Sequence, residues 1–202
     1  NTHFKSATNQ TPRFAKPGFP GEIKKISMEL KLLADVGLVG QPNAGKSTIL
    51  ATLSAARPKI ADYPFTTLHP HLGIVKFREF KSCVMADIPG LIEGASQGKG
   101  LGHQFLRHIQ RTKLLAYVID VNETDIKKAL RTLQKELKEF DPYLLNKPSM
   151  VVITKTDTIS ESDLLKLSKK LPPDYIYISA VAGKGLKKFL QEIEKQLDQL
   201  RN

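Results

Sequence analysis

The chain has 202 residues, of which 41% are hydrophobic, and this is enough for one sizeable domain with a full core. No apolar run approaches the roughly 18 to 20 residues that a membrane span needs, and the amino terminus lacks the apolar core of a secretory signal. We therefore expect a soluble, cytoplasmic protein with no membrane span. The single cysteine, Cys83, excludes an intrachain disulfide and is expected to be a small core residue.

The formal net charge is +11, from 31 Lys and Arg against 20 Asp and Glu. Such an excess indicates either a polyanionic partner or a solvated basic surface with no specific partner, and charge alone does not separate the two. Aromatic residues are few and do not alternate with basic ones as in an RNA-binding sheet. Sequence-specific readout of single-stranded RNA is therefore not supported.

Residues 1–30 do not have the pattern of a domain. Turn and breaker signals occur at Thr11-Pro12, Lys16-Pro17-Gly18 and Phe19-Pro20-Gly21, with no hydrophobic period. This segment is predicted to be a linker or the tail of a separate domain, and residues 31–202 are predicted to form the folded domain.

From Leu32 onward, apolar runs of strand length alternate with helical periods. This alternation predicts an α/β fold, a mostly parallel six-stranded sheet with helices on both faces. The expected strands are 34–39, 73–77, 82–86, 114–119, 150–153 and 175–178, of which 73–77 and 82–86 pair antiparallel. Helices are expected at 47–56, 101–112, 126–140 and 186–200, and from a capping box at Ser160-Glu161-Ser162-Asp163 to Leu171.

The stretch from Gly40 to Ser47, GQPNAGKS, fits the phosphate-loop pattern G-x-x-x-x-G-K-[ST]. Glycine lets the backbone turn tightly, consecutive N–H groups then point at phosphate oxygens, and the following helix adds the positive end of its dipole. The alternative, an ordinary strand-to-helix turn, is disfavoured by the strand before the loop and the helix after it. Residues predicted to contact phosphate are Gly40, Gln41, Pro42, Asn43, Ala44, Gly45, Lys46, Ser47 and Thr48.

Two of these side chains have specific expected roles. Lys46 is expected to reach the β- and γ-phosphates. Ser47 is expected to place its hydroxyl on a Mg²⁺ that bridges those phosphates, since this cation binds through few protein ligands.

The motif Asp87-Ile88-Pro89-Gly90 directly follows a predicted strand. Alone, D-x-x-G is usually a turn, but its position favours a nucleotide-state sensor. Asp87 can approach the Mg²⁺ and the Gly90 N–H can meet the γ-phosphate. The glycines at 90, 94, 98, 100 and 102 then favour a mobile second switch, with 101–112 as its helix.

The segment between the loop and Asp87 contains Phe65, Thr66 and Thr67 between prolines. A threonine here can add a hydroxyl to Mg²⁺ and a backbone N–H to the γ-phosphate, so that the segment is ordered only when triphosphate is bound. Thr67 is the first candidate and Thr66 the second. The alternative is a plain connecting loop.

Two short motifs after the last strands predict a base pocket: Thr154-Lys155-Thr156-Asp157 and Ser179-Ala180-Val181. The Asp157 carboxylate can accept hydrogen bonds from N1–H and the 2-amino group of guanine, whereas adenine offers neither donor. This argues against an ATPase on the same fold. The stem of Lys155 is expected to cover the base, and the Ala180 N–H to meet O6 of guanine.

These motifs, in this order, resemble the guanine-nucleotide-binding domain of the translation-factor-type GTPases. The connecting sequences at 34–40, 60–68 and 87–111 strongly resemble the Obg (CgtA) family of bacterial GTPases, and the match covers essentially the whole chain. Residues 3–21 are similar to the end of that family's glycine-rich amino-terminal domain. The resemblance implies that the chain is a fragment whose residues 31–202 form a P-loop NTPase-type G domain.

The same resemblance implies GTP and GDP as ligands and slow, Mg²⁺-dependent hydrolysis of GTP to GDP and phosphate. It also implies a switch that acts in assembly of the large ribosomal subunit, with links to the alarmone ppGpp. We expect only weak binding of rRNA by this fragment, because much of that family's ribosome-facing surface belongs to the amino-terminal domain. We expect a monomer.

The sequence departs from the usual GTPase pattern at two positions. Thr154 replaces the Asn of Asn-Lys-x-Asp; its hydroxyl can still join the base pocket to the phosphate loop. Leu91 stands where many GTPases have a water-orienting Gln, so hydrolysis is expected to be slow without a partner or a monovalent cation. Leu91 also favours the alternative of a binding module, gated by GDP, GTP or ppGpp, in which hydrolysis is incidental.

Asn43 is a candidate for the missing catalytic help. In related GTPases that lack the Gln, an Asn at the matching place coordinates K⁺ near the phosphates. The alternative, that Asn43 only braces the loop, stays open. Lys46, Thr67, Gly90 and Asn43 are thus the catalytic candidates, and Ser47, Thr67 and Asp87 the metal-ligand candidates.

Overall fold

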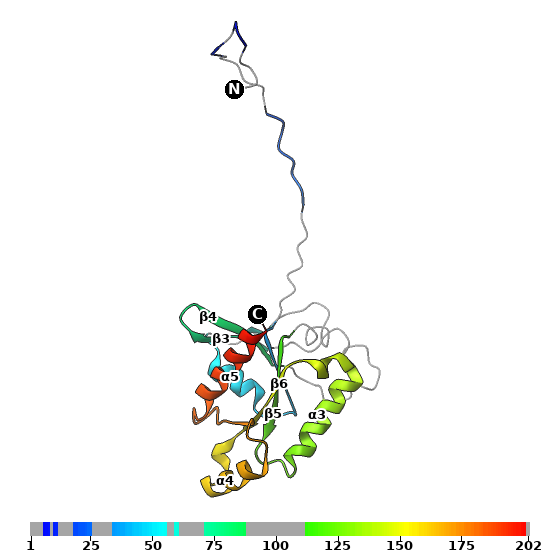
Figure 1. Ribbon diagram of the computed structural model, residues 1–202, viewed down its shortest axis with the longest axis vertical. Coiled ribbons are helices and arrows are strands. Elements are labelled where there is room, and N and C mark those ends of the chain that lie inside the picture. Colours follow the sequence, from blue (N-terminus) through cyan, green and yellow to red (C-terminus); the bar gives the residue numbers. More distant parts are fainter. Residues whose placement is uncertain are drawn as a thin grey trace. The chain divides into compact units, whose positions relative to one another are not determined.

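The computed structural model describes residues 6–8, 10–11, 18–25, 34–55, 59–60, 71–87 and 112–200. By its internal contacts the chain divides into two units, residues 1–31 and 32–202. The named helices and strands all belong to the second unit (Figure 1). No helix in the described ranges is long and apolar enough to cross a bilayer.

The second unit is built on a seven-stranded sheet of order β2-β3-β4-β1-β5-β6-β7. Strands β4, β1, β5, β6 and β7 run parallel, while β2 and β3 are antiparallel to their neighbours. All six predicted strands are present, and the α/β fold is confirmed; the two-residue β2 is additional. The strands are β1 Val36–Gly40, β2 Lys59–Ile60, β3 His71–Arg78, β4 Lys81–Asp87, β5 Leu114–Asp120, β6 Ser149–Thr154 and β7 Ile176–Tyr177.

The described helices are α1 Lys46–Leu53, α3 Ile126–Phe140, α4 Glu161–Lys170 and α5 Leu186–Gln199, with short 3₁₀ helices η3 Pro142–Asn146 and η4 Thr156–Thr158. The capping box is confirmed, because the Ser160 hydroxyl accepts a hydrogen bond from the Asp163 N–H at 3.1 Å. The helix predicted at 101–112 lies outside the described residues apart from Thr112.

The predicted end of the first helix, at residue 56, is wrong. Helix α1 ends at Leu53, because the next two residues bind the neighbouring strand instead of continuing the helix. Ser54 forms a bridge with Val75, and the Ala55 N–H donates to the Ile74 carbonyl at 2.9 Å. A hydrogen-bonded strand edge therefore overrides the helical propensity of this alanine-rich stretch.

Helices cover both faces of the sheet, as predicted. On one face α1 and α5 pack over a core that includes Leu50, Phe189 and the buried Cys83. On the other face α3 and η3 contribute Leu133, Leu137 and Leu144. Figure 1 shows α5 and α3 on opposite sides of the strands.

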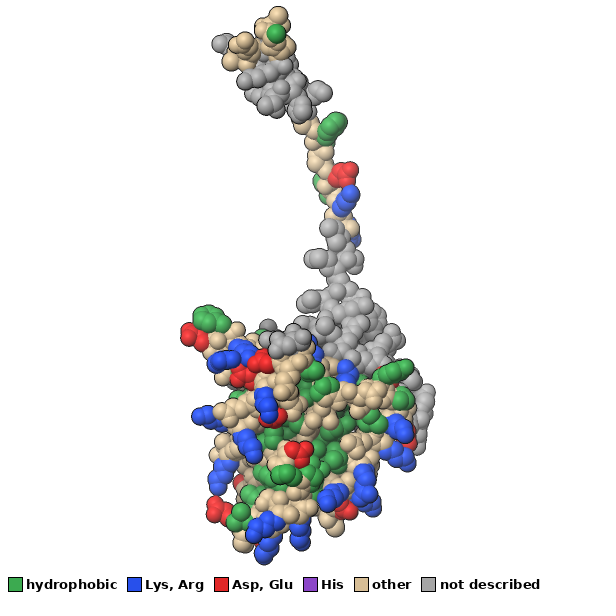
Figure 2. Space-filling view, viewed as in Figure 1, with side chains coloured by type: hydrophobic (Ala, Val, Ile, Leu, Met, Phe, Trp, Pro, Cys, Tyr) green, Lys and Arg blue, Asp and Glu red, His purple; other side chains and the backbone are tan. Residues whose placement is uncertain are grey.

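The parallel strands bring their carboxyl ends to one edge of the sheet. Gly40, Asp87, Asp120 and Thr154 are the last residues of β1, β4, β5 and β6, which are neighbours in the sheet. In open α/β sheets this edge is where ligands bind. The basic residues, by contrast, are spread among acidic ones over the face that Figure 2 displays, and form no single patch there.

Candidate functional site

The phosphate-loop sequence forms a tight turn between β1 and α1. Gly40 lies directly against β5, and a Cβ atom added there would stand 2.2 Å from the Val118 carbonyl oxygen. Asn43 and Gly45 have left-handed backbones, with φ angles of 61° and 95°. Asn and Gly adopt this conformation more readily than other residues. The loop sequence therefore matches the backbone that it forms.

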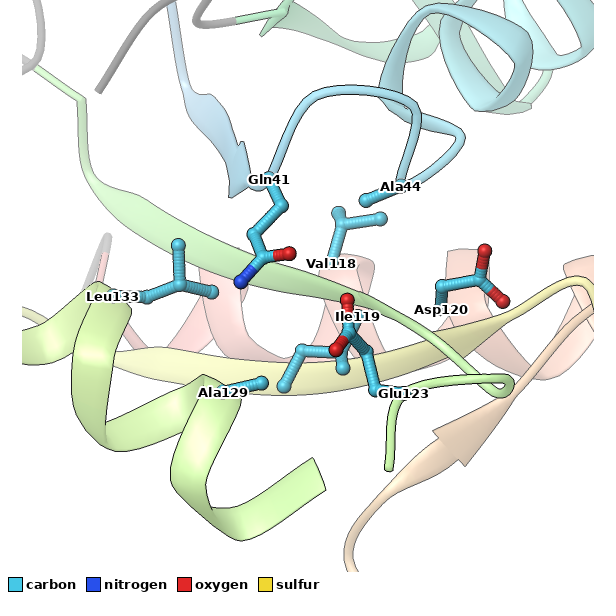
Figure 3. Close-up of a pocket in the computed structure, with 8 residues that line it drawn as sticks. All are labelled: Gln41, Ala44, Val118, Ile119, Asp120, Glu123, Ala129 and Leu133. Carbon is cyan, nitrogen blue, oxygen red and sulfur yellow. The ribbon is translucent and has the colours of Figure 1, made fainter. Parts of the chain in front are cut away.

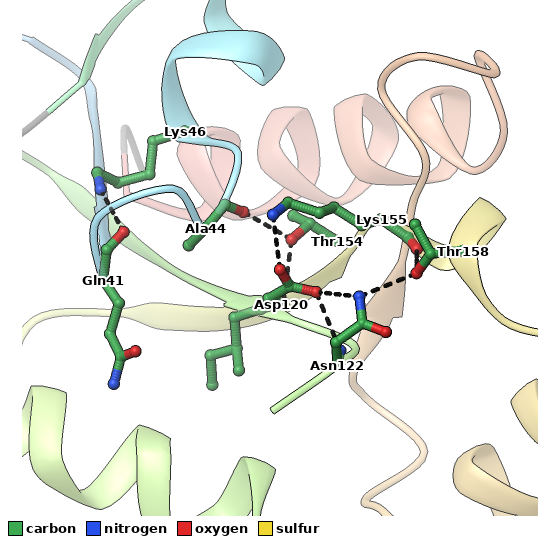
Figure 4. Close-up of polar contacts among 9 residues, drawn as sticks. Gln41, Ala44, Lys46, Asp120, Asn122, Thr154, Lys155 and Thr158 are labelled. Carbon is green, nitrogen blue, oxygen red and sulfur yellow. Dashed lines mark hydrogen bonds and ion pairs between the residues drawn. The ribbon is translucent and has the colours of Figure 1, made fainter. Parts of the chain in front are cut away.

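Lys46 is a buried cation at the centre of this loop. Its side chain donates hydrogen bonds to the Gly40 and Gln41 carbonyls, both at 2.9 Å. Figure 4 shows the second of these bonds. Desolvation lowers the pKa of Lys46, although the charge of Asp87 acts in the opposite direction. Among the described residues Lys46 has no carboxylate partner in an ion pair, so this positive charge is available to an incoming anion.

The predicted metal ligands Ser47 and Asp87 are in contact. The Ser47 hydroxyl donates a short hydrogen bond to Asp87 Oδ2. The other oxygen of this carboxylate, Oδ1, is buried and has no hydrogen-bond partner within the described part of the chain. A buried carboxylate oxygen without a partner is costly, and Mg²⁺ prefers oxygen ligands, so the pair fits a Mg²⁺ ion.

Thr154 joins the base side of the site to the phosphate loop. Its buried hydroxyl lies 2.7 Å from the Ala44 carbonyl oxygen and 3.1 Å from that of Ile119 (Figure 4). The expected link from this threonine to the phosphate loop is therefore present in the structure. A single hydroxyl reaches both the loop and the end of β5.

The two predicted base-pocket motifs lie next to each other. The Thr156 N–H donates to the Ile178 carbonyl at 3.3 Å, and the turn after β7 is closed by the Ser179 N–H, which donates to the Lys184 carbonyl at 3.0 Å. Asp157 is exposed; the hydroxyl of Ser179, aided by the charge of Lys184, holds the pKa of its carboxyl below the usual range. Asp157 is thus an ionised acceptor that faces solvent.

Asp120 and Asn122 also belong to the site, and neither was predicted from the sequence. Asp120 Oδ2 lies 2.6 Å from the Lys155 ammonium, and its Oδ1 accepts hydrogen bonds from the backbone and side-chain amides of Asn122 (Figure 4). Asp120 follows the strand-length run 114–119 just as Asp87 follows 82–86. Its position at the carboxyl end of a strand, where ligands bind in open α/β sheets, could therefore have indicated Asp120 from the sequence.

A narrow hollow lies beside the phosphate loop, between β5 and α3 (Figure 3). It is lined by Gln41, Ala44, Val118, Ile119, Asp120, Glu123, Ala129 and Leu133, and has no room for a water molecule. The Gln41 side chain points into it, toward α3. This hollow is therefore a gap in the packing behind the loop, and the candidate site is the open edge above the strands.

The remaining predicted site residues lie outside the described part of the chain. They are Phe65, Thr66, Thr67, Ile88, Pro89 and Gly90, together with Leu91. Their roles stay predictions. Pro42, Thr48, Ala180 and Val181 are described, with Val181 strongly exposed next to the buried Ser179.

Comparison with known families gives a match over residues 35–155 to the family described as 50S ribosome-binding GTPase. The chain is 58% identical over 197 residues to the GTPase Obg of Chlorobaculum tepidum, which covers 98% of this chain and 58% of that protein. It is 56% identical to the GTPase Obg of Bacteroides thetaiotaomicron, over 92% of this chain and 48% of that protein. The chain thus spans about half the length of these relatives.

Solved structures with the same fold include Aquifex aeolicus Era Y63A bound to GDP·AlF₄⁻, with a TM-score of 0.61 and 26% identity over 81% of this chain and 56% of that one. The G domain of the T. maritima FeoB iron transporter matches with a TM-score of 0.60 and 21% identity, over 82% of this chain and 99% of that one. At 21% identity the second match supports the fold alone.

Proposed function

Because the chain belongs to the 50S ribosome-binding GTPases, and within them to the Obg family, we propose that residues 31–202 bind GTP and hydrolyse it slowly to GDP and phosphate. Residues 1–30 are then the tail of the amino-terminal domain. GTPases of this kind require Mg²⁺. The chain acts as a switch whose state depends on the bound nucleotide.

The proposal rests on Lys46, a buried ammonium at the start of a helix whose hydrogen bonds to described residues go to two neutral carbonyls. A phosphate group supplies an anion that can bind this ammonium directly, and the loop N–H groups and the dipole of α1 add to its binding. Lys46 then exchanges its bonds to Gly40 and Gln41 for bonds to the β- and γ-phosphates. Its charge opposes the negative charge that develops between them.

Mg²⁺ would be held by Ser47 and Asp87, with Thr67 as the third candidate. When bound, the cation neutralises charge on the β- and γ-phosphates. Ser47 and Asp87 hold the oxygen ligands in place through their mutual hydrogen bond. The partnerless Asp87 Oδ1 supports this assignment.

Guanine is recognised by the Asp157 carboxylate, whose lowered pKa keeps it a pure acceptor at neutral pH. The stem of Lys155 covers one side of the base, and the backbone of 179–181 closes the other. Gly90 and Thr67 donate hydrogen bonds from their backbone N–H groups to the γ-phosphate, so that their positions depend on its presence. This pocket selects GTP over ATP because guanine offers the carboxylate an N1–H and a 2-amino donor, whereas adenine offers neither and would cover the acceptor without pairing it.

Asn43 completes the catalytic set as a K⁺ ligand. Its side chain is exposed and therefore accessible to a cation. The test is single-turnover GTP hydrolysis in K⁺ and in Na⁺ at equal ionic strength. We expect a K⁺-specific acceleration that is lost in Asn43→Ala and kept in Asn146→Ala, an exposed asparagine on η3. Equal rates in both salts would contradict the K⁺ role.

The partner that fits the family is the large ribosomal subunit during its assembly, in the cytoplasm, with the chain as a monomer and ppGpp as a competing ligand. The spread of basic residues in Figure 2 fits weak contact of this fragment with rRNA. Co-sedimentation with 50S particles in GTP, GDP and ppGpp tests this assignment. No binding of the full-length protein in any nucleotide state would contradict it.

A further inference from the structure

A closed ring of polar contacts joins the end of β5 to the turn that carries Asp157. Its members are Asp120 at the end of β5, Asn122 just after it, and Lys155 and Thr158 after β6 (Figure 4). None of these contacts reaches phosphate-loop side chains. The proposed function leaves this ring without a role beyond the stem of Lys155.

The ring holds Lys155 at both ends. Its ammonium lies 2.6 Å from Asp120 Oδ2. Its carbonyl accepts hydrogen bonds from the Thr158 hydroxyl at 2.8 Å and the Thr158 N–H at 3.0 Å. Asn122 connects the two ends, because its side-chain amide donates to Asp120 Oδ1 and to Thr158 Oγ1, both at 2.9 Å.

Lys155 needs such support because its backbone is left-handed, with φ 56° and ψ 34°. This conformation is unfavourable for a residue with a Cβ and persists where the surroundings fix it. It turns the chain from β6 into η4, whose central residue is Asp157. The two residues that the ring fixes, Lys155 and Thr158, therefore bracket the proposed guanine acceptor.

Asp120 is anchored firmly enough to fix this turn. As the last residue of β5 it pairs in register with Thr154, and the Val121 N–H donates to the Thr154 carbonyl at 3.0 Å. Its side chain is only 19% exposed. The charge of Lys155 is thus placed by a rigid strand rather than by a mobile loop.

We propose that Asp120, supported by Asn122, is a positioning residue for guanine specificity: it fixes the stem of Lys155 over the base and sets the turn that presents Asp157. This inference rests on the proposed function. It assigns part of the discrimination between bases to a residue of β5 that acts through Lys155.

The test compares binding of GDP, of IDP, whose hypoxanthine base lacks the 2-amino group, and of inorganic pyrophosphate, which has no base. We expect Asp120→Asn in the 202-residue chain to weaken GDP about tenfold and to reduce the preference for GDP over IDP. Pyrophosphate affinity stays at the wild-type value. Asp198→Asn is the matched control, because it removes the carboxylate of another ion pair, 2.6 Å from Lys81. It should leave the affinities for all three ligands unchanged.

A double-mutant cycle separates positioning from a general loss of stability. If Asp120 acts through Lys155, Asp120→Asn has little further effect on GDP affinity in the Lys155→Met background. Asn122→Ala, which keeps the ion pair, is expected to shift the GDP-to-IDP ratio in the same direction. It serves as a second variant should Asp120→Asn fold poorly.

Wild-type GDP affinity and preference in Asp120→Asn would overturn the inference, and so would an equal loss for all three ligands. A wild-type chain that binds pyrophosphate but does not prefer GDP over IDP would overturn the proposed function, and the inference with it. The two failures are distinguishable because the first appears only in the variants.

Discussion

Replacing Thr154 by valine removes one hydroxyl and almost no volume. Thr154 as a whole is only 3% exposed. Its hydroxyl lies 2.7 Å from the Ala44 carbonyl oxygen and 3.1 Å from that of Ile119. Valine has nearly the same shape, so no cavity forms. The loss comes from a buried acceptor whose partner has gone, which destabilises a protein by about 1–3 kcal/mol.

We therefore expect Thr154→Val to lower the free energy of unfolding by about 2 kcal/mol in urea denaturation followed by circular dichroism. Thr132→Val makes the same chemical change on the exposed surface of α3 and should stay within about 0.5 kcal/mol of wild type. A loss at Thr154 no larger than the loss at Thr132 would refute the link between β6 and the phosphate loop.

Three further outcomes are expected. Gly40→Ala places a Cβ 2.2 Å from the Val118 carbonyl oxygen and should destabilise the chain by about 3 kcal/mol in the same assay, whereas Gly21→Ala, which meets no atom within 4 Å, should not. Lys46→Met should weaken GDP about 100-fold by calorimetry; unchanged affinity would exclude Lys46 from the phosphate site. Burial raises the pKa of Asp120, but hydrogen bonds from Lys155 and Asn122 outweigh it and leave the pKa below the usual range of an aspartate. Because the folded pKa is depressed, the stability that Asp120 contributes should be complete above about pH 4 and be lost as the pH falls below that value. If the free energies of unfolding of wild type and Asp120→Asn differed by a constant amount down to about pH 2, this expectation would be contradicted.

The fold was predictable because its strands are buried on both faces and so appear as continuous apolar runs. Val36–Gly40 is entirely buried, and Leu114–Asp120 nearly so. The two-residue β2 has no pattern to detect, since a strand of this length shows no alternation. The end of α1 was not predictable from local sequence, because Ser54 and Ala55 are held by β3, which lies far along the chain.

The candidate site was predictable where a motif has a fixed spacing, as from Gly40 to Ser47. Asp120 belongs to no such motif. Its position at a strand end is visible in the sequence, but its ion pair with Lys155 is not, because that contact depends on the sheet order, which places β5 between β1 and β6. The partnerless Oδ1 of Asp87 is likewise a property of the folded chain that no spacing reveals.

Recognition of guanine by the Asp157 carboxylate is central to the proposed function. The most direct measurement is the affinity of wild type and Asp157→Asn for GDP, ADP and XDP, whose xanthine base carries a carbonyl in place of the 2-amino group. Wild type should prefer GDP over both by at least about 100-fold, and the variant, which offers an amide donor, should prefer XDP. Equal binding of GDP and ADP by wild type, or an unchanged preference for GDP in the variant, would contradict the account.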